Sequence, residues 1–335
     1  MLKIGIDISK LTIDCAYFVN DKSHHRKFSN NEAGFKLLLG WVKNPDNNSV
    51  DKTTLFCMEA TGIYHFMLAK FLFEKGFSVI VANPIKTHHF AKLKMMRNKT
   101  DKTDALLITQ YCEYLDFNKS IDKNLWQPKA AMFEDLQYLV MRLVQLDKQK
   151  RTECNRLEIA SNKIIVKSLK LAIKQLDKQI NVIETGVKDL IKANAKLSDQ
   201  IELLKTIDGI GNKTAWSLLA YAGDMSAFDN ANQITSFVGL NPKQRQSGSS
   251  VAGSSLSKTG HRKLRKSLYM PALVAIQYNP LLKTYYENLL ARGKVKMVAV
   301  IAVMRKLLVI CYGVLKSGQA FDVDYVKKKQ ALRLA

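Results

Sequence analysis

The order of hydrophobic patterns in the first third of the chain constrains the fold more than any other feature. Three short runs with strand-like patterns come first: Leu2–Ser9, Thr12–Asn20 and His24–Ser29. Helical and strand-like runs then alternate over Asn31–Val42, Thr53–Met58, Gly62–Lys75 and Phe77–Ala82. The first three runs predict an antiparallel meander. The whole order, β-β-β-α-β-α-β-α, predicts an α/β domain in which helices cover a mixed sheet.

A long helical region follows, because glycine nearly vanishes between Met132 and Glu202 while Lys, Gln, Glu and Leu dominate. Two sets of apolar residues recur at steps of three and four: Leu136, Leu139, Leu143 and Leu146, and Leu176, Ile180, Ile183, Val187 and Leu190. Such steps predict coiled-coil-like seams on two helices. The break near Ser161 predicts either a hairpin or a long arm that dimerises. A helical subdomain packed on its own chain is an equal alternative.

A second globular unit, mostly helical, is predicted from Leu203 to Gly318, with a turn-rich loop between Gly239 and Gly260. Met297–Leu315 is strongly apolar but carries Arg305 and Lys306 at its centre, which predicts a buried helix and not a membrane span. The 335 residues are therefore divided into an α/β domain (1–130), a coiled-coil helical arm (131–202), a mostly helical C-terminal domain (203–320) and a basic tail (321–335).

The charge of the chain indicates a polyanionic partner. Its 52 Lys and Arg residues against 29 Asp and Glu residues give a formal charge of +23, and each phosphate that such a protein neutralises releases counterions. A solvated basic surface is the plainer alternative. The five cysteines are scattered and form no C-x-x-C pair, which argues against a disulfide framework or a zinc module. With no signal peptide at the N-terminus, we expect a cytoplasmic protein.

Four acidic residues lie where one sheet could bring them together: Asp7, Glu59, Asp101 and Asp104. Asp7 lies inside the first strand and Glu59 ends the fourth, while Asp101 and Asp104 are three residues apart at the start of a predicted helix. Each has an ordinary explanation, such as a solvent-facing strand residue or a carboxylate near a helix N-terminus. Together they predict a site for two Mg²⁺ ions, since two ions clamp the attacking and leaving oxygens in phosphoryl transfer.

Basic residues flank both the acids and a serine-rich segment. Lys92, Lys94, Arg97 and Lys99 precede Asp101. No acidic residue occurs between Asp229 and Glu287, an interval with these candidate contacts to nucleic acid: Lys243, Arg245, Lys258, His261, Arg262, Lys263 and Arg265. Ser247, in Gln246-Ser247-Gly248, is a candidate nucleophile if a metal or base activates it. A Ser/Gly linker is the alternative for this segment.

The segment Thr206–Ala215 contains Gly209-Ile210-Gly211 and has the pattern of a helix-hairpin-helix element. In such an element, glycines expose backbone amides to a phosphate at a helix N-terminus. A tight helix–helix turn without any ligand is an equal alternative.

These motifs together resemble the DEDD transposases of the insertion-sequence-110 family, over nearly the whole chain. The resemblance is carried by Gly5-Ile6-Asp7, Met58–Gly62 and Lys99–Ala105 in the N-terminal part, and by Gly209-Ile210-Gly211, Phe237–Pro242, Gln246-Ser247-Gly248 and Lys258–Arg265 in the C-terminal part. It implies a ribonuclease H-like (RuvC-like) N-terminal domain, a coiled-coil arm and a transposase domain with a catalytic serine. Serines at 249, 250, 254 and 255 crowd Ser247 and set this chain apart.

The resemblance also implies roles and partners. Asp7, Glu59, Asp101 and Asp104 would be metal ligands, and Ser247 would form a transient covalent link to a DNA phosphate. The partners would be donor and target DNA, a structured bridge RNA that guides the protein to both, and further copies of the chain, as dimers paired into tetramers in a bacterial cytoplasm. The implied function is a site-specific recombinase that mobilises its own insertion sequence.

Three other functions remain open on the residues alone. A metal-dependent nuclease or Holliday-junction resolvase would use the same acids to hydrolyse DNA. A sugar-kinase-like ATPase would use Gly5–Ser9 as a phosphate loop, although no second glycine-rich loop follows. A non-catalytic DNA-binding scaffold would account for the charge but not for the acids.

Overall fold

The computed structural model describes residues 1–43, 50–60, 62–96, 100–128, 130–247, 251–257 and 259–324, with the backbone alone for 244–247 and 251–254. The chain divides into two compact units, Met1–Pro128 and Lys129–Ala335. Each unit has its own hydrophobic core. The first holds the four predicted acids, and Ser247 belongs to the second.

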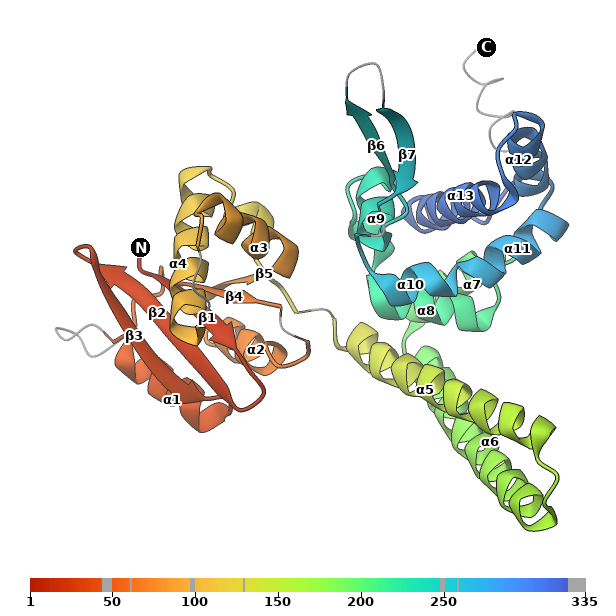
Figure 1. Ribbon diagram of the computed structural model, residues 1–335, viewed down its shortest axis with the longest axis horizontal. Helices are drawn as coiled ribbons and strands as arrows, with labels where there is room; N and C mark the ends of the chain where they lie inside the picture. Colours follow the sequence, from red (N-terminus) through yellow and green to blue (C-terminus); the bar gives the residue numbers. More distant parts are fainter. Residues whose placement is uncertain are drawn as a thin grey trace. The chain divides into compact units, whose positions relative to one another are not determined.

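The first unit is built on a five-stranded mixed sheet with the order β3-β2-β1-β4-β5 (Figure 1). The strands are β1 (Lys3–Ile8), β2 (Thr12–Val19), β3 (Lys22–Ser29), β4 (Leu55–Glu59) and β5 (Ser78–Ala82). The first three form an antiparallel meander, and β4 and β5 run parallel to β1. The predicted mixed sheet is therefore confirmed, and β1, which carries Asp7, is its central strand.

Helices cover both faces of this sheet. The helices α1 (Glu32–Trp41) and α2 (Phe66–Glu74) pack on one face, and α3 (Pro84–Leu93) and α4 (Asp101–Phe117) pack on the other. A short 3-10 turn, η1 (Asp122–Asn124), follows. The predicted helix over Gly62–Lys75 begins later, at Phe66, because Gly62 has a left-handed φ of 55° and opens a turn instead.

The close approach of α4 to β1 depends on Gly5. A Cβ atom at this position would lie 2.3 Å from both the carbonyl oxygen of Ala105 and the backbone nitrogen of Thr109. The buried Thr109 hydroxyl accepts a hydrogen bond from Gly5 N at 3.1 Å and donates toward Ala16 O and Ala105 O. With no side chain on β1 at this point, the first turn of α4 lies beside the end of β1 that carries Asp7.

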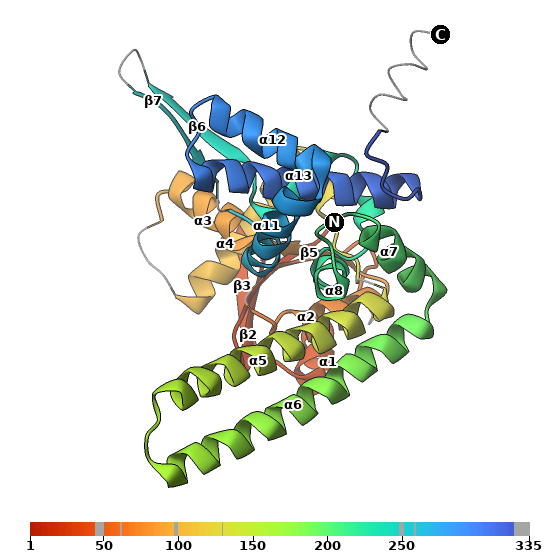
Figure 2. The ribbon, with the colours of Figure 1, turned by 90° about the vertical axis from the view of Figure 1, so that its right-hand side faces the viewer.

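The second unit begins with two long helices, α5 (Ala131–Ile159) and α6 (Lys163–Lys192), joined by a short connection whose Asn162 caps the N-terminus of α6 (Figures 1 and 2). They pack side by side as an antiparallel hairpin, which is one of the two arrangements that the break near Ser161 predicts. Leu136, Leu143 and Val187 are among the buried seam residues, and they join the same hydrophobic core as the helices that follow. The hairpin therefore packs against the other helices of its own chain.

The remaining helices are α7 (Ala195–Lys205), α8 (Asn212–Ala222), η2 (Met225–Ala227), α9 (Ala231–Val238), α10 (Arg262–Ser267), α11 (Tyr269–Tyr278), α12 (Pro280–Ala291) and α13 (Lys296–Ser317). Of the described helices, α13 is the one long and apolar enough to cross a membrane. Ala299, Val303, Leu307 and Cys311 on it are fully buried in the core. This confirms the prediction of a buried helix here.

The predicted turn-rich loop at Gly239–Gly260 is wrong over much of its length. Strands β6 (Pro242–Ser247) and β7 (Val251–Leu256) pair there as an antiparallel hairpin, with Ser247 opposite Val251. Backbone hydrogen bonds hold such a pair whatever the side chains are. The residues of both strands are mostly polar or small, so no alternation of apolar and polar residues marks them in the sequence.

Candidate active site

Asp7 and Asp14 lie directly opposite each other on β1 and β2. Asp7 is partly buried and Asp14 is almost fully buried. Opposite residues of an antiparallel pair project from the same face of the sheet, so the two carboxylates share one environment. A carboxylate in such a place needs charged or hydrogen-bonding partners.

The negative charges of the other predicted acids act on the carboxylate of Asp7. Burial and the negative charges of Asp104, Asp101, Glu59 and Asp14, in decreasing order of effect, together raise the pKa of Asp7 from 3.8 to about 6. The three other acids predicted from the sequence therefore lie near enough to Asp7 for their charges to act on its carboxylate. A raised carboxylate pKa in a cluster of like charges is a common feature of functional sites.

Glu59 ends β4 at the same edge of the sheet as the end of β1. The hydroxyl of Thr87, on α3, donates its one proton to Glu59 Oε2 at 2.7 Å and shares it with Pro84 O at 3.0 Å. Thr87 itself is buried. The hydrogen bond orients the Glu59 carboxylate, and it joins α3 to the candidate active site.

Asp101 and Asp104 lie in the first turn of α4. Thr100 caps this helix and forms a reciprocal capping box with Thr103, which sets the helix start at Asp101. The spacing of three places both carboxylates on one face, near the positive end of the helix dipole. Asp101 is bound by Lys27 of β3, at 3.1 Å between Nζ and Oδ2.

The carboxylates suit a divalent metal chemically, since hard cations prefer carboxylate oxygens and a cation would offset the burial and the repulsion that raise the pKa of Asp7. Among the described residues, no group of three or more His, Cys, Asp or Glu side chains is arranged to hold an ion. The carboxylates thus act on one another through their charges, and their assignment as direct metal ligands stays a prediction.

The predicted nucleic-acid contacts are distributed over both units. Lys92 and Lys94 are exposed at the end of α3. In the second unit, Lys243, Arg262 and Lys263 are exposed. Arg97, Lys99 and Lys258 lie outside the described residues, and Ser247 and Arg245 are described by their strand backbone alone. Contact with nucleic acid remains a prediction for all of them.

His261 and Arg265 have clear structural partners. His261 Nδ1 accepts a hydrogen bond of 3.1 Å from Leu264 N and caps α10, and its ring stacks on Phe237. Arg265 donates to Val238 O at 2.9 Å. These contacts join α10 to the end of α9, so both side chains stabilise this part of the second unit whether or not they also contact a phosphate.

The predicted helix-hairpin-helix segment does form a short connection between α7 and α8, with Gly211 at the N-cap of α8. Gly209 has a φ of 102°, and a Cβ there would lie 2.8 Å from Ala275 Cβ. Close packing against α11 is thus sufficient to account for Gly209. A Cβ on Gly211 would meet no atom within 4 Å.

Asp14, Lys27 and Thr87 contribute to the site but were not among the residues predicted from the sequence. A signal existed for Asp14, because an acidic residue between Ile13 and Cys15 in a strand is unusual unless it has a partner. Lys27 and Thr87 lie in polar or helical segments without any such signal. Only long-range contacts identify them.

Two family models match the chain. A model of DEDD transposases, described as "Transposase", matches residues 4–160, and a model described as "Transposase IS116/IS110/IS902 family" matches residues 201–287. Together they include the four acids and Ser247. A DEDD transposase domain has a ribonuclease H-like fold, which agrees with the mixed sheet of the first unit, and uses divalent metal.

Several known proteins are similar in sequence. The "Pilin gene-inverting protein" of Moraxella bovis is 34% identical over 322 residues, which cover 95% of this chain and 97% of that protein. The "Insertion element IS110 uncharacterized 43.6 kDa protein" of Streptomyces coelicolor is 28% identical over 48% of this chain and 38% of its own. The "Transposase for insertion sequence element IS1111A" of Coxiella burnetii is 33% identical over 26% of this chain and 24% of its own.

Proposed function

Because the chain belongs to the IS110/IS116/IS902 family of transposases, enzymes that act on DNA, we propose that it is a site-specific recombinase that cuts and rejoins DNA with Ser247 as the nucleophile. The Moraxella relative is named for inverting a gene, and inversion and transposition both require cutting followed by rejoining. The observation that carries the proposal is that the charges of Asp104, Asp101 and Glu59 all act on the partly buried carboxylate of Asp7.

We propose that Asp7, Glu59, Asp101 and Asp104 hold Mg²⁺, with two ions as the expected number. When bound, the metal polarises the scissile phosphate and neutralises charge that develops on its oxygens. The protein supplies oxygen ligands on three elements of one rigid domain: the strands β1 and β4 and the helix α4. Ligands fixed by regular elements keep their geometry better than ligands on loops.

The proposed reaction conserves the energy of the DNA backbone. The Ser247 hydroxyl loses its proton and attacks phosphorus, a P–O bond to the DNA sugar breaks, and the released sugar oxygen takes up a proton. The hydroxyl of a second DNA end then attacks the phosphoserine, re-forms a phosphodiester and returns the proton to Ser247. No ATP is consumed, since each step exchanges one phosphoester for another.

DNA binding follows from the family, and the two sets of basic residues support particular contacts. We propose that Lys92, Lys94, Arg97 and Lys99 follow a phosphate backbone beside the acids. A second track would comprise Lys243, Arg245, Lys258, His261, Arg262, Lys263 and Arg265. The charge of +23 agrees with such contacts.

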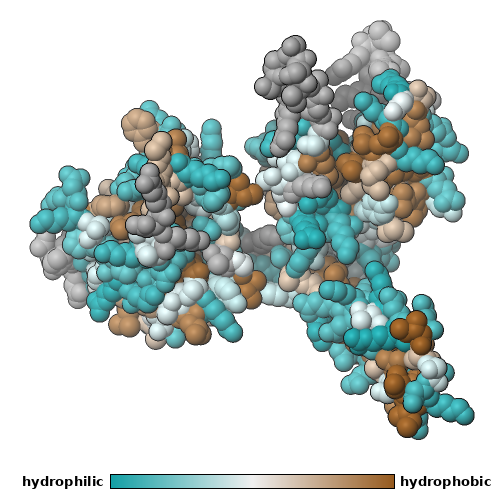
Figure 3. All heavy atoms as spheres, viewed as in Figure 1, coloured by the Kyte–Doolittle hydropathy of each residue, from teal (hydrophilic) through white to brown (hydrophobic). Residues whose placement is uncertain are grey.

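We also propose a bridge RNA that pairs with donor and target DNA, assembly as dimers paired into tetramers, and action in the bacterial cytoplasm. The exposed apolar residues near the turn of the α5–α6 hairpin support assembly: Ile159 is 86% exposed and Ile164 is 80% exposed. Figure 3 shows hydrophobic atoms at the surface of this end of the hairpin. Patches of this kind mark interaction surfaces.

The serine step is tested with a DNA substrate whose strand, once cut, cannot be rejoined. The wild-type protein should accumulate a covalent protein–DNA adduct on a denaturing gel, and Ser247→Ala should form none. Ser255→Ala, changed on the paired strand β7, is the matched control and should still form the adduct. An adduct that persists in Ser247→Ala would contradict the proposal.

A second candidate function, hydrolysis by a metal-dependent nuclease or junction resolvase, is favoured by the same acids. It predicts free DNA ends, no adduct, and full cleavage by Ser247→Ala. Sequencing of RNA that co-purifies with the protein tests the guide: the expected RNA is a single structured species with segments complementary to donor and target DNA. A heterogeneous RNA pool without such segments would contradict it.

A further inference from the structure

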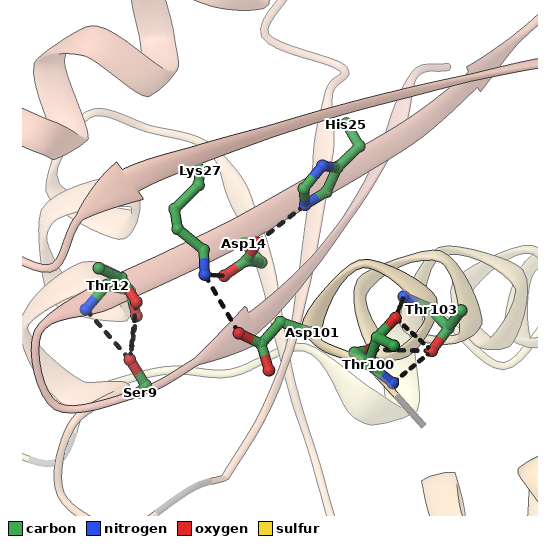
Figure 4. A network of polar contacts seen from close by, with 8 residues as sticks. All are labelled: Ser9, Thr12, Asp14, His25, Lys27, Thr100, Asp101 and Thr103. Atoms are coloured by element: carbon green, nitrogen blue, oxygen red, sulfur yellow. Dashed lines mark hydrogen bonds and ion pairs between the residues drawn. The ribbon is translucent and has the colours of Figure 1, made fainter. Parts of the chain in front are cut away.

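We infer that Lys27 is a positioning residue of the active site, which fixes the Asp101 carboxylate by joining it to Asp14. The inference rests on the proposed metal site, because it assigns a role toward one of that site's ligands. Figure 4 shows the arrangement: the Lys27 ammonium lies between the carboxylates of Asp14 and Asp101, and His25 lies on the other side of Asp14.

Asp14 is the more restrained of the two carboxylates that Lys27 contacts. Its side chain is 5% exposed, and both of its oxygens are engaged. His25 Nε2 lies 2.9 Å from Oδ1, and Lys27 Nζ lies 3.1 Å from Oδ2. A buried carboxylate with a partner on each oxygen is held in one orientation.

The Asp101 side chain is the less restrained of the two that Lys27 contacts. Its side chain is 65% exposed, so packing against neighbours restrains it little. The Thr100–Thr103 capping box sets the backbone at this helix start but does not restrain the Asp101 side chain. Lys27 contacts Oδ2 of Asp101 at 3.1 Å, which leaves Oδ1 of the same carboxylate for another ligand. The contact therefore orients the Asp101 carboxylate and leaves one of its oxygens able to bind a metal ion.

The position of Lys27 in the sheet makes this role specific. Lys27 pairs with Asp14 across β2 and β3, and Asp14 pairs with Asp7 across β1 and β2. Lys27, Asp14 and Asp7 thus form one row across three neighbouring strands. Lys27 also contacts Asp101 of α4, so it connects the helix that carries two of the acids to β2, the strand paired with the one that carries Asp7.

Outer groups that orient metal ligands commonly change metal affinity 10- to 100-fold when removed. We therefore expect Lys27→Met to weaken Mn²⁺ binding to the full-length protein about 10- to 100-fold, as measured by titration calorimetry and the Mn²⁺ EPR signal. Lys27→Arg keeps the cation and should restore most of the affinity. Asp14→Asn weakens the anchor and should shift binding in the same direction as Lys27→Met.

Lys3→Met is the matched control. Lys3 on β1 forms an ion pair of 2.6 Å with Asp116, in the last turn of the same helix α4. The variant also removes one lysine that joins the sheet to α4, but at the far end of the helix from the acids, so Mn²⁺ binding should not change. Thermal unfolding of each variant identifies any loss of fold.

Two results are decisive and distinguishable. The first result requires that the wild-type protein binds Mn²⁺ and that Asp7→Asn abolishes this binding. If Lys27→Met then binds Mn²⁺ as tightly as the wild type or more tightly, Lys27 does not position Asp101 and the inference is overturned. If the wild-type protein itself shows no Asp7-dependent binding, the proposed metal site is wrong and the inference fails with it.

Discussion

Gly5 of β1 and Thr109 of α4 are joined by a hydrogen bond of 3.1 Å between Gly5 N and the Thr109 hydroxyl, 104 residues apart in the chain. The contact is possible because Gly5 has no side chain, so the backbone of α4 lies directly against the strand. The candidate active site depends on this packing, since α4 delivers Asp101 and Asp104 to the end of β1 that carries Asp7.

Gly5→Ala should lower the free energy of unfolding by about 3 kcal/mol and reduce activity, because the added methyl group would overlap backbone atoms that cannot move independently. Gly40→Ala is the control: Gly40 lies in α1, where a Cβ meets no atom within 4 Å. That substitution should instead stabilise the protein by about 0.5–1 kcal/mol. Chemical denaturation measures both. Equal effects of the two variants would show that β1 and α4 do not pack this closely.

Asp7→Asn should abolish recombination while stabilising the protein in the absence of divalent metal. The Asp7 carboxylate repels its neighbours and is partly desolvated, and an amide removes that repulsion. After allowance for solvent screening the gain is about 1 kcal/mol, measured by denaturation at pH 7. A variant that is less stable than wild type, with an intact fold, would contradict the picture of a repulsive acidic cluster.

The pH dependence of this stability difference has a definite sign. The folded-state pKa of Asp7, about 6, is above its ordinary value of 3.8, so the folded protein binds the proton more tightly than the unfolded chain. The contribution of Asp7 to stability should therefore fall as pH rises from about 4 to 6, and should stay constant above that range. Denaturation of wild type and Asp7→Asn from pH 4 to 8 should give curves that diverge over this interval. Parallel curves would exclude a raised pKa.

Metal affinity should show the complementary dependence. A carboxylate must lose its proton to bind a cation, so Mn²⁺ affinity should rise about tenfold per pH unit up to pH 6 and then level off. Titration at several pH values in the absence of DNA measures this. An affinity already constant at pH 5 would mean that Asp7 is not a ligand, or that its pKa is not raised.

Thr87→Val should reduce activity about 10- to 100-fold with little effect on stability. Valine has nearly the volume of threonine but cannot donate the 2.7 Å hydrogen bond to Glu59. The measurement is recombination rate at saturating and limiting Mg²⁺, where added metal should recover part of the loss. Thr87→Ser retains the hydroxyl and is the control; a loss as large as that of the valine variant would assign Thr87 a packing role instead.

Local patterns in the chain were enough to predict the mixed sheet, two long helices at α5 and α6 and the buried α13, because side-chain periodicity depends only on neighbouring residues. The four acids could also be selected, since Asp7 lies inside a strand, where a carboxylate needs a partner, and the other three lie at the ends of a strand and a helix that one sheet could bring together. In contrast, β6 and β7 pair through backbone groups, and their polar residues carry no periodic signal.

The residues that pair with or orient the acids are set by contacts between segments far apart in the sequence. Asp14 faces Asp7 because of the register of β1 and β2, and Lys27 reaches Asp101 across 74 residues because β3 and the start of α4 meet at one edge of the fold. Thr87 reaches Glu59 because α3 packs beside the end of β4. Strand register and helix docking are set by the packing of the whole core, so the residues that orient the carboxylates become visible only once the domain has folded.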